Sequence, residues 1–291
     1  MELGFLGAGF MSAPMIENLL TDGHSVRVWN RTGVKARALV EAGAIAVPDP
    51  ADVASPAGVV ISCLADDTAL DAVFDDGRVL AALGQDGLHV SMSTVSATCT
   101  ERLSAMHTGQ GCTYVAAPIL GRPDAVKARM QSYLLAGAAD GCDRIRPVLE
   151  RLGAKIFEFG VEPTAAAVAK INFNFLIAAA VEAMSEAFAV VEKSGVDPRA
   201  FHQMVIGSAF GCRIYDGYGS FILEQAWDAP LFKLALGLKD VRLANETATD
   251  CDATMRLGQL LEKRFAESVD HGLGDKDWTA IAAEVREEAG L

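Results

Sequence analysis

The sequence is poor in the features that mark several large classes of protein. Lys and Arg number 25 against 38 Asp and Glu, for a formal net charge of -13, so the surface repels phosphate backbones and anionic lipid. The six cysteines include no Cys-x-x-Cys pair and the five histidines follow no metal-ligand spacing. We therefore expect reduced thiols, a cytoplasmic location, no metal, and neither nucleic acid nor membrane as a partner. A small anionic ligand held by backbone amides stays compatible with this charge.

No segment has the composition of a secretion signal or a membrane span. The chain starts Met1-Glu2-Leu3-Gly4, without a basic region. A span needs about 20 mostly apolar residues. The most apolar stretch, 164–191, is interrupted by polar residues, namely Lys170, Asn172, Asn174, Glu182 and Glu186. It is typical of a buried helix in a soluble protein.

The first 160 residues alternate short apolar runs with amphipathic segments. Strands are expected at the apolar runs 3–6, 25–29, 58–64, 88–92, 113–117, 132–136 and 155–159. Helices are expected between them, at 13–20, 35–41, 98–107 and 143–152. This alternation predicts a mostly parallel, doubly wound α/β sheet of the Rossmann type.

The strand pattern stops after Gly160. Pro163 is a typical helix start and Gly195 a typical C-cap, which predicts a helix on the order of 45 Å long. Further helices are expected at 198–206, 232–250, 253–269 and 278–288. We therefore expect a dinucleotide-binding Rossmann domain over 1–162. An all-α substrate and dimerisation domain is expected over 163–291, beginning with the long interdomain helix.

A glycine-rich turn, Gly7-Ala8-Gly9-Phe10-Met11-Ser12, lies between the first strand and the first helix. Gly7 permits the tight turn, and Gly9 lets backbone amides approach a pyrophosphate at the helix N-terminus. Residues 7–11 are thus expected to bind a dinucleotide, the alternative being a purely structural turn.

The second strand ends in Asn30-Arg31-Thr32, where an NAD site usually has Asp or Glu. Arg31 is suited to pair with a 2′-phosphate and Thr32 to donate to it, so NADP(H) is expected in preference to NAD(H). The alternative is that Arg31 is a solvated surface charge. Leu64 and Ala65 end another strand, at the sheet edge where dinucleotides bind, and are added to the cofactor site.

Lys170 and Asn174 share one face of the long helix because they are four residues apart. Their neighbours are Ala, Val, Ile and Phe. A lysine in such surroundings either extends its ammonium group to water or lies in a cleft as a general acid. An ammonium in a cleft would stabilise the alkoxide-like oxygen that forms as hydride reaches a carbonyl carbon. Asn174 would orient the lysine or the substrate.

Several segments occur in the order found in the β-hydroxyacid dehydrogenase family. They are Gly7–Ser12, Ser93-Thr94-Val95-Ser96, Ala117-Pro118, Lys170 with Asn174, and Lys239-Asp240, and Asp277-Trp278 resembles that family's C-terminal signature. The chain resembles the 3-hydroxyisobutyrate dehydrogenase-related branch over almost its full length. The resemblance implies a Rossmann domain, a long interdomain helix, an all-α domain and a homodimer or tetramer.

The same resemblance implies roles for individual residues. Lys170 would be the catalytic acid/base and Asn174 its substrate-side partner. Thr94 would contact the nicotinamide end of the cofactor, and Lys239 would close over the site. Ser93 is expected to contact substrate.

The chain departs from the family in its substrate motif. Where the family has Asp-Ala-Pro-Val-Ser-Gly-Gly, residues 116–122 are Ala-Ala-Pro-Ile-Leu-Gly-Arg, so Leu120 replaces the serine that helps hold a carboxylate. Gly121 keeps a backbone N–H for the substrate. Arg122 either binds an anion, caps the next helix or is solvated, and Phe173 replaces a family asparagine.

These observations predict an oxidoreductase that moves hydride between NADP(H) and a small β-hydroxy acid or its semialdehyde. One alternative is an imine reductase on the same fold, against which Lys170 argues. The other is a non-catalytic NADP-binding protein.

Overall fold

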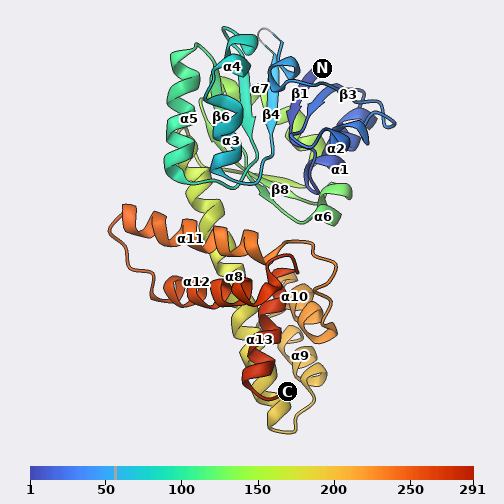
Figure 1. Cartoon of the computed structure of the whole chain (residues 1–291), viewed down its shortest axis with the longest axis vertical. Helices are drawn as coiled ribbons and strands as arrows, with labels where there is room; N and C mark the ends of the chain where they lie inside the picture. The colour runs from blue at the N-terminus through green and yellow to red at the C-terminus, as the bar shows by residue number, and fades with distance from the viewer. Residues whose placement is uncertain (56–57) are drawn as a thin grey trace. The chain divides into compact units, whose positions relative to one another are not determined.

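The computed structural model describes residues 1–55 and 58–291. It divides into two compact units, Met1–Lys170 and Ile171–Leu291, which run from blue to yellow-green and from yellow to red in Figure 1. The boundary lies inside helix α8 (Pro163–Lys193) rather than ahead of it, where the sequence placed it. The reason is that Ala166, in the first turn of α8, is fully buried in a core of the first unit.

The first unit is built on one sheet with the strand order β3-β2-β1-β4-β5-β6-β8-β7, and β9 also pairs with β8. Strands β1 to β6 run parallel in the order of a Rossmann sheet, β8 is antiparallel to β6 and β7, and β9 is parallel to β8. The strands are β1 (Glu2–Leu6), β2 (Ser25–Trp29), β3 (Ile45–Ala46), β4 (Val59–Ser62), β5 (Leu88–Ser91), β6 (Thr113–Ala116), β7 (Ile119–Leu120), β8 (Ser132–Gly137) and β9 (Lys155–Glu158). The expected doubly wound, mostly parallel fold is confirmed.

Helices connect these strands and cover both faces of the sheet. They are α1 (Ser12–Thr21), α2 (Gly33–Arg37), η1 (Pro50–Val53), α3 (Asp67–Phe74), α4 (Arg78–Leu83), α5 (Ala97–Gly109), α6 (Pro123–Lys127) and α7 (Ala139–Leu152). One core contains Leu3 and Phe5 together with Met15 of α1 and Ile145 of α7. The core on the other face contains Leu6 with residues of α3, α4 and α5. Alternate strand residues are thus buried on opposite faces, as expected of a sheet covered on both sides.

The regular elements described in the second unit are helices, apart from one isolated bridge between Lys233 and Asp277. Besides the main part of α8 it contains α9 (Pro198–Ile206), α10 (Arg213–Glu224), α11 (Leu234–Asp250), α12 (Arg256–Ser268), η2 (Val269–Leu273), η3 (Trp278–Ala280) and α13 (Ile281–Glu288). Helix α8 is long and apolar enough to cross a membrane by length and composition, with a mean hydropathy of 1.5 over one window. Its residues Ile177, Val181, Met184 and Phe188 nevertheless form the core of this unit, so α8 is the central helix of a helical bundle.

The differences from the sequence-based expectation concern short elements and one helix. Strands β3 and β7 have two residues each, too few to show a period-2 pattern. Helix α2 ends at Arg37 instead of continuing to residue 41. Helix α10 was not expected because it contains Gly217 and Gly219, which the sequence alone suggests are breakers.

Candidate functional site

The glycine-rich turn between β1 and α1 has the geometry of a phosphate cradle. Gly7 has a φ of +110°, and a Cβ atom there would lie 2.5 Å from the carbonyl oxygen of Cys63. At Gly9, by contrast, a Cβ atom would meet no atom of residues 1–55 or 58–291 within 4 Å. None of the described side chains caps the N-terminus of α1 at Met11. Within the first turn of α1 the N–H of Ala13 bonds to the carbonyl of Gly9 at 2.9 Å and Pro14 has no N–H. The open space at Gly9 and the uncapped start of α1 together fit the pyrophosphate of a dinucleotide.

Asn30 holds the glycine turn against the end of β2. Its Oδ1 accepts a 3.0 Å hydrogen bond from the backbone N–H of Ala8, and its Nδ2 donates to the carbonyl of Thr32 at 3.0 Å. Both ends of this amide are thus bonded to backbone. The arrangement gives Asn30 a part in shaping the glycine-rich turn, and it leaves the adjacent Arg31 and Thr32 exposed.

The loops that follow β4 and β5 are linked through Ser93. The buried hydroxyl of Ser93 accepts a 2.8 Å hydrogen bond from the backbone N–H of Leu64. Leu64 and Thr94 are half-buried and Ala65 is exposed. These two loops leave the carboxyl ends of neighbouring parallel strands, the edge at which Rossmann sheets bind dinucleotides.

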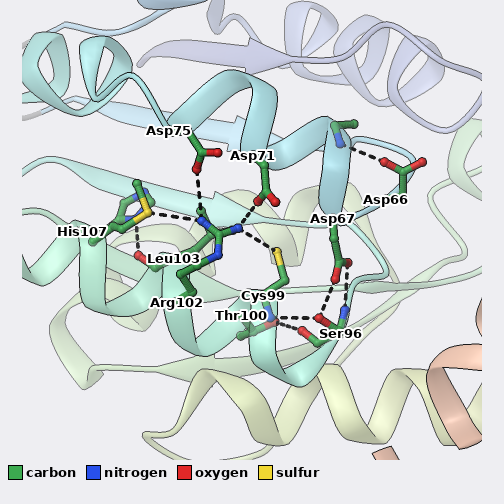
Figure 2. A network of polar contacts seen from close by, with 12 residues as sticks. Asp66, Asp67, Asp71, Asp75, Ser96, Cys99, Thr100, Arg102, Leu103 and His107 are labelled. Atoms are coloured by element: carbon green, nitrogen blue, oxygen red, sulfur yellow. Dashed lines mark hydrogen bonds and ion pairs between the residues drawn. The ribbon is translucent and has the colours of Figure 1, made fainter. Parts of the chain in front are cut away.

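A network of polar contacts also links the helices that follow these two loops, α3 and α5 (Figure 2). Asp66 is the N-cap of α3 and accepts from the N–H of Ala69 at 2.8 Å. Asp67 accepts from both the backbone N–H of Ser96, at 3.0 Å, and its hydroxyl, at 2.5 Å. Ser96 in turn caps α5 through the N–H of Cys99. The two acidic residues therefore have structural roles, and Asp67 holds the start of α3 against the start of α5.

The segment expected to bind substrate follows β7. Leu120 is half-buried, packs against the core that contains Leu6, and lies opposite Ser132 in the β7–β8 pair. A Cβ atom at Gly121 would lie 2.8 Å from the Cβ of Gln131, so this position requires glycine. Arg122 occupies the N-cap position of α6, with its Nε 3.6 Å from a carboxylate oxygen of Asp124. Its side chain is 28% exposed.

Lys170 and Asn174 lie one turn apart on α8, and both are buried, with 7% and 5% of their surface exposed. The side-chain amide of Asn174 donates to Oδ2 of Asp240, on α11, at 2.5 Å. The ammonium group of Lys239 lies 2.9 Å from Oδ1 of the same carboxylate. The second unit thus brings two of the predicted residues, Asn174 and Lys239, onto one carboxylate that is 1% exposed.

Asp240 is the residue to which sequence reasoning gave no role. The sequence contains a feature that could have indicated a role. Asp240 directly follows Lys239 on a helix, and the neighbouring positions Leu238, Val241 and Ala244 are apolar and buried. Charged side chains are almost never fully buried without partners, so an acidic residue on such a face indicates a partner such as Asn174.

Known proteins match the chain over nearly its whole length. Residues 2–160 match the family model described as the NAD binding domain of 6-phosphogluconate dehydrogenase, and residues 164–285 that described as NAD-binding of NADP-dependent 3-hydroxyisobutyrate dehydrogenase. The oxidoreductase YfjR of Bacillus subtilis is 37% identical over 97% of this chain and 98% of its own. The chain belongs to the β-hydroxyacid dehydrogenase family, in its 3-hydroxyisobutyrate dehydrogenase-related branch.

Two further relatives agree with this membership. Glyoxylate/succinic semialdehyde reductase 1 of Arabidopsis thaliana is 30% identical over 98% of this chain and 99% of its own. The solved structure of Mycobacterium tuberculosis 3-hydroxyisobutyrate dehydrogenase with L-serine superposes with a TM-score of 0.88, at 27% identity over 98% of both chains. This dehydrogenase is therefore an NAD(P)-dependent oxidoreductase, and the cradle around Gly7 and Gly9 suits its dinucleotide.

Proposed function

We propose that this dehydrogenase uses NADP(H) in preference to NAD(H). Its substrate would be a small β-hydroxy acid or the corresponding semialdehyde, and Lys170 would be the general acid/base. The observation that carries the proposal is the burial of Lys170 one turn from Asn174, whose amide is oriented by the carboxylate of Asp240. A lysine is rarely this buried without a specific task or partner. The cofactor, when bound, supplies or accepts the hydride.

The residues of the chain have separate tasks in this scheme. The ammonium group of Lys170 donates a proton to the carbonyl oxygen during reduction and its amine accepts one during oxidation. Asn174 hydrogen-bonds the reacting oxygen or the lysine, and Lys239 and Thr94 contact the cofactor. The Gly121 N–H and the Arg122 guanidinium bind the carboxylate of the substrate, and Ser93 also contacts the substrate. The preference for NADP(H) rests on the exposed pair Arg31 and Thr32, which replaces an acidic residue.

The proposal extends to assembly and location. Leu176 and Val190 are 63% and 64% exposed on α8, which supports a homo-oligomer that covers them. All six cysteines are free thiols, which favours the cytoplasm. Light scattering of the purified enzyme at several concentrations tests the first point, since a monomer at all of them would contradict it.

The decisive experiment compares Lys170→Ala with Lys193→Ala, which removes an exposed lysine from the other end of the same helix. Succinic semialdehyde and glyoxylate, the substrates in the name of the Arabidopsis relative, are assayed with NADPH beside a panel of cyclic imines. Lys170→Ala should lower kcat at least about a hundredfold, a loss of about 3 kcal/mol of transition-state stabilisation. The NADPH dissociation constant should stay near the wild-type value. Normal turnover by Lys170→Ala, or turnover of imines in place of aldehydes, would refute the proposal.

A further inference from the structure

Arg129, just after α6, binds the carboxylate of Asp22, the C-cap residue of α1, with both arms of its guanidinium group. Nη1 donates to Oδ2 of Asp22 at 2.8 Å, and Nη2 donates to Oδ1 at 3.1 Å. This paired geometry is the strongest that arginine forms with a carboxylate. The Asp22 side chain is only 7% exposed, and its hydrogen bonds to Arg129 and Arg151 hold the pKa of the carboxyl well below its usual range.

The same guanidinium group also binds backbone on two helices. Nη1 donates to the carbonyl of Arg151, at the end of α7, at 2.8 Å. Nη2 donates to the carbonyl of Asn18, on α1, at 3.2 Å. Arg129 therefore joins the end of α6 to α1 and α7 within the first unit.

The backbone conformation at residue 129 favours glycine, so the arginine found there is explained by the contacts of its side chain. Its φ is +58°, a left-handed conformation that costs a residue other than glycine about 1 kcal/mol. Glycine would suit this backbone better but has no guanidinium group. The hydrogen bonds to Asp22, Asn18 and Arg151 offset this cost.

A second set of contacts continues from α1 to the substrate segment. The side-chain amide of Asn18 donates to the carbonyl of Val126 at 2.9 Å. The N–H of Val126 donates to the carbonyl of Arg122 at 3.0 Å. Gly121 packs closely against Gln131, where the segment that connects β7 to β8 begins and ends. The stretch from Gly121 to Gln131 is thus fixed at its base by the β7–β8 pair and at its far end by Asn18 and Arg129.

Helix α1 also begins at the glycine-rich turn, so both binding segments are attached to one helix. We propose that Arg129, acting with Asp22 and Asn18, is a positioning residue. It fixes the position of Gly121 and Arg122 relative to the phosphate cradle. The inference rests on the proposed function in one respect, the role of Arg122 in binding the substrate carboxylate. Its consequence is that the substrate segment is a rigid part of the Rossmann unit and does not close over the substrate as a lid.

The test uses four variants of the full-length enzyme. Arg129→Gly suits the left-handed backbone but removes all the hydrogen bonds of the guanidinium group, and Arg129→Lys keeps the charge without the paired geometry. Arg151→Ala is the matched control, because it removes only the 62% exposed second cation of Asp22. Arg122→Ala removes the proposed carboxylate ligand itself.

The primary measurements are KM for succinic semialdehyde and the NADPH dissociation constant. Arg129→Gly should raise KM about tenfold or more, since misplacement of a binding group by about 1 Å has effects of this size. The NADPH dissociation constant should not change, because the glycine turn is intact. Arg129→Lys should fall between wild type and Arg129→Gly, and Arg151→Ala should match wild type.

Amide hydrogen exchange gives a measurement that does not depend on substrate. The Val126 amide, which donates to the Arg122 carbonyl, should exchange faster in Arg129→Gly, whereas amides of β1 and β4 should not. An unchanged rate at Val126 would overturn the inference.

The kinetic results separate this inference from the proposed function. If Arg122→Ala raises KM and Arg129→Gly does not, the positioning role is wrong and the substrate site stands. If Arg122→Ala leaves KM unchanged, Arg122 does not bind substrate, and both the proposed site and the positioning role fall.

Discussion

The side-chain amide of Asn174 donates a 2.5 Å hydrogen bond to Oδ2 of Asp240, and the ammonium group of Lys239 lies 2.9 Å from the other oxygen of that carboxylate. One buried carboxylate therefore orients an amide on α8 and a lysine on α11. Both partners belong to the second unit, so this relationship is set within one packed helical core.

Asp240→Asn is expected to impair catalysis. The substitution keeps the shape of the side chain but removes its charge, so the amide of Asn174 loses a charged acceptor worth about 1.5–3 kcal/mol. We expect kcat/KM to fall about tenfold to a hundredfold. Steady-state kinetics on succinic semialdehyde checks this, with Asp250→Asn, an exposed carboxylate on the same helix, as the control. A variant that keeps wild-type kcat/KM would show that Asn174 needs no such orientation.

Arg31→Ala should weaken NADPH binding and leave NADH binding unchanged. A charge-assisted hydrogen bond to the 2′-phosphate is worth about 1.5–3 kcal/mol, or about tenfold to a hundredfold in the dissociation constant. Titration calorimetry with both cofactors measures the two effects separately. Arg37→Ala, which removes another exposed arginine from α2, controls for the general loss of positive charge. Equal affinity of the wild-type enzyme for NADPH and NADH would rule out the role given to Arg31.

Much of this fold could be predicted because its elements are marked by local pattern. All seven expected strands are present, and α8 and α9 lie where Pro163, Gly195 and Pro198 indicated. Helix α10 could not be predicted, since the need for Gly219 depends on a distant residue. A Cβ atom there would lie 2.4 Å from Nε2 of His202, so glycine is required by packing against α9. A single sequence does not show such a contact.

The sequence suggests residue types for the candidate site, but the hydrogen-bond partners of these residues depend on the fold. The glycine turn follows a local pattern, and its geometry at Gly7 and Gly9 agrees with that pattern. The side-chain amide of Asn30, however, hydrogen-bonds to the backbone of Ala8 and Thr32, and the folded loops bring these partners within reach. The pairing of Asn174 with Asp240 joins residues 66 positions apart, which no local pattern reveals.

Leu120→Ser should improve binding of small carboxylate substrates if Leu120 replaces a carboxylate-binding serine. Because Leu120 packs against the core, the substitution should also cost about 1–2 kcal/mol of stability. Leu120→Ala is the matched control, since it loses the same packing without gaining a hydroxyl. We expect KM for succinic semialdehyde to fall in Leu120→Ser and not in Leu120→Ala. Equal KM values in the two variants would place residue 120 outside the substrate site.

Two fully buried histidines predict that the enzyme loses stability in mild acid. Nδ1 of His107 lies 2.6 Å from the carbonyl of Leu103 and must donate to it, so its Nε2 accepts from Nδ1 of His89 at 2.8 Å. Nε2 of His89 then accepts from the hydroxyl of Ser62 at 2.8 Å. This chain of hydrogen bonds is the one that two neutral rings form, and burial favours the neutral state of both. Burial lowers the pKa of His107 to about 4, and burial with the neighbouring His107 lowers the pKa of His89 well below its usual value.

Because both pKa values are lowered, the unfolded chain binds these protons more readily than the folded protein does. The stability that the neutral pair contributes is complete above about pH 6.5 and is lost as the pH falls, by up to about 1.4 kcal/mol per pH unit for each histidine. For His107 this loss extends down to about pH 4. Urea unfolding between pH 7 and pH 4.5 measures this slope, and His107→Gln should reduce it. His271→Gln is the control, because Glu284 raises the pKa of the exposed His271 and its contribution has the opposite sign. A slope that His107→Gln leaves unchanged would assign the proton uptake to other groups.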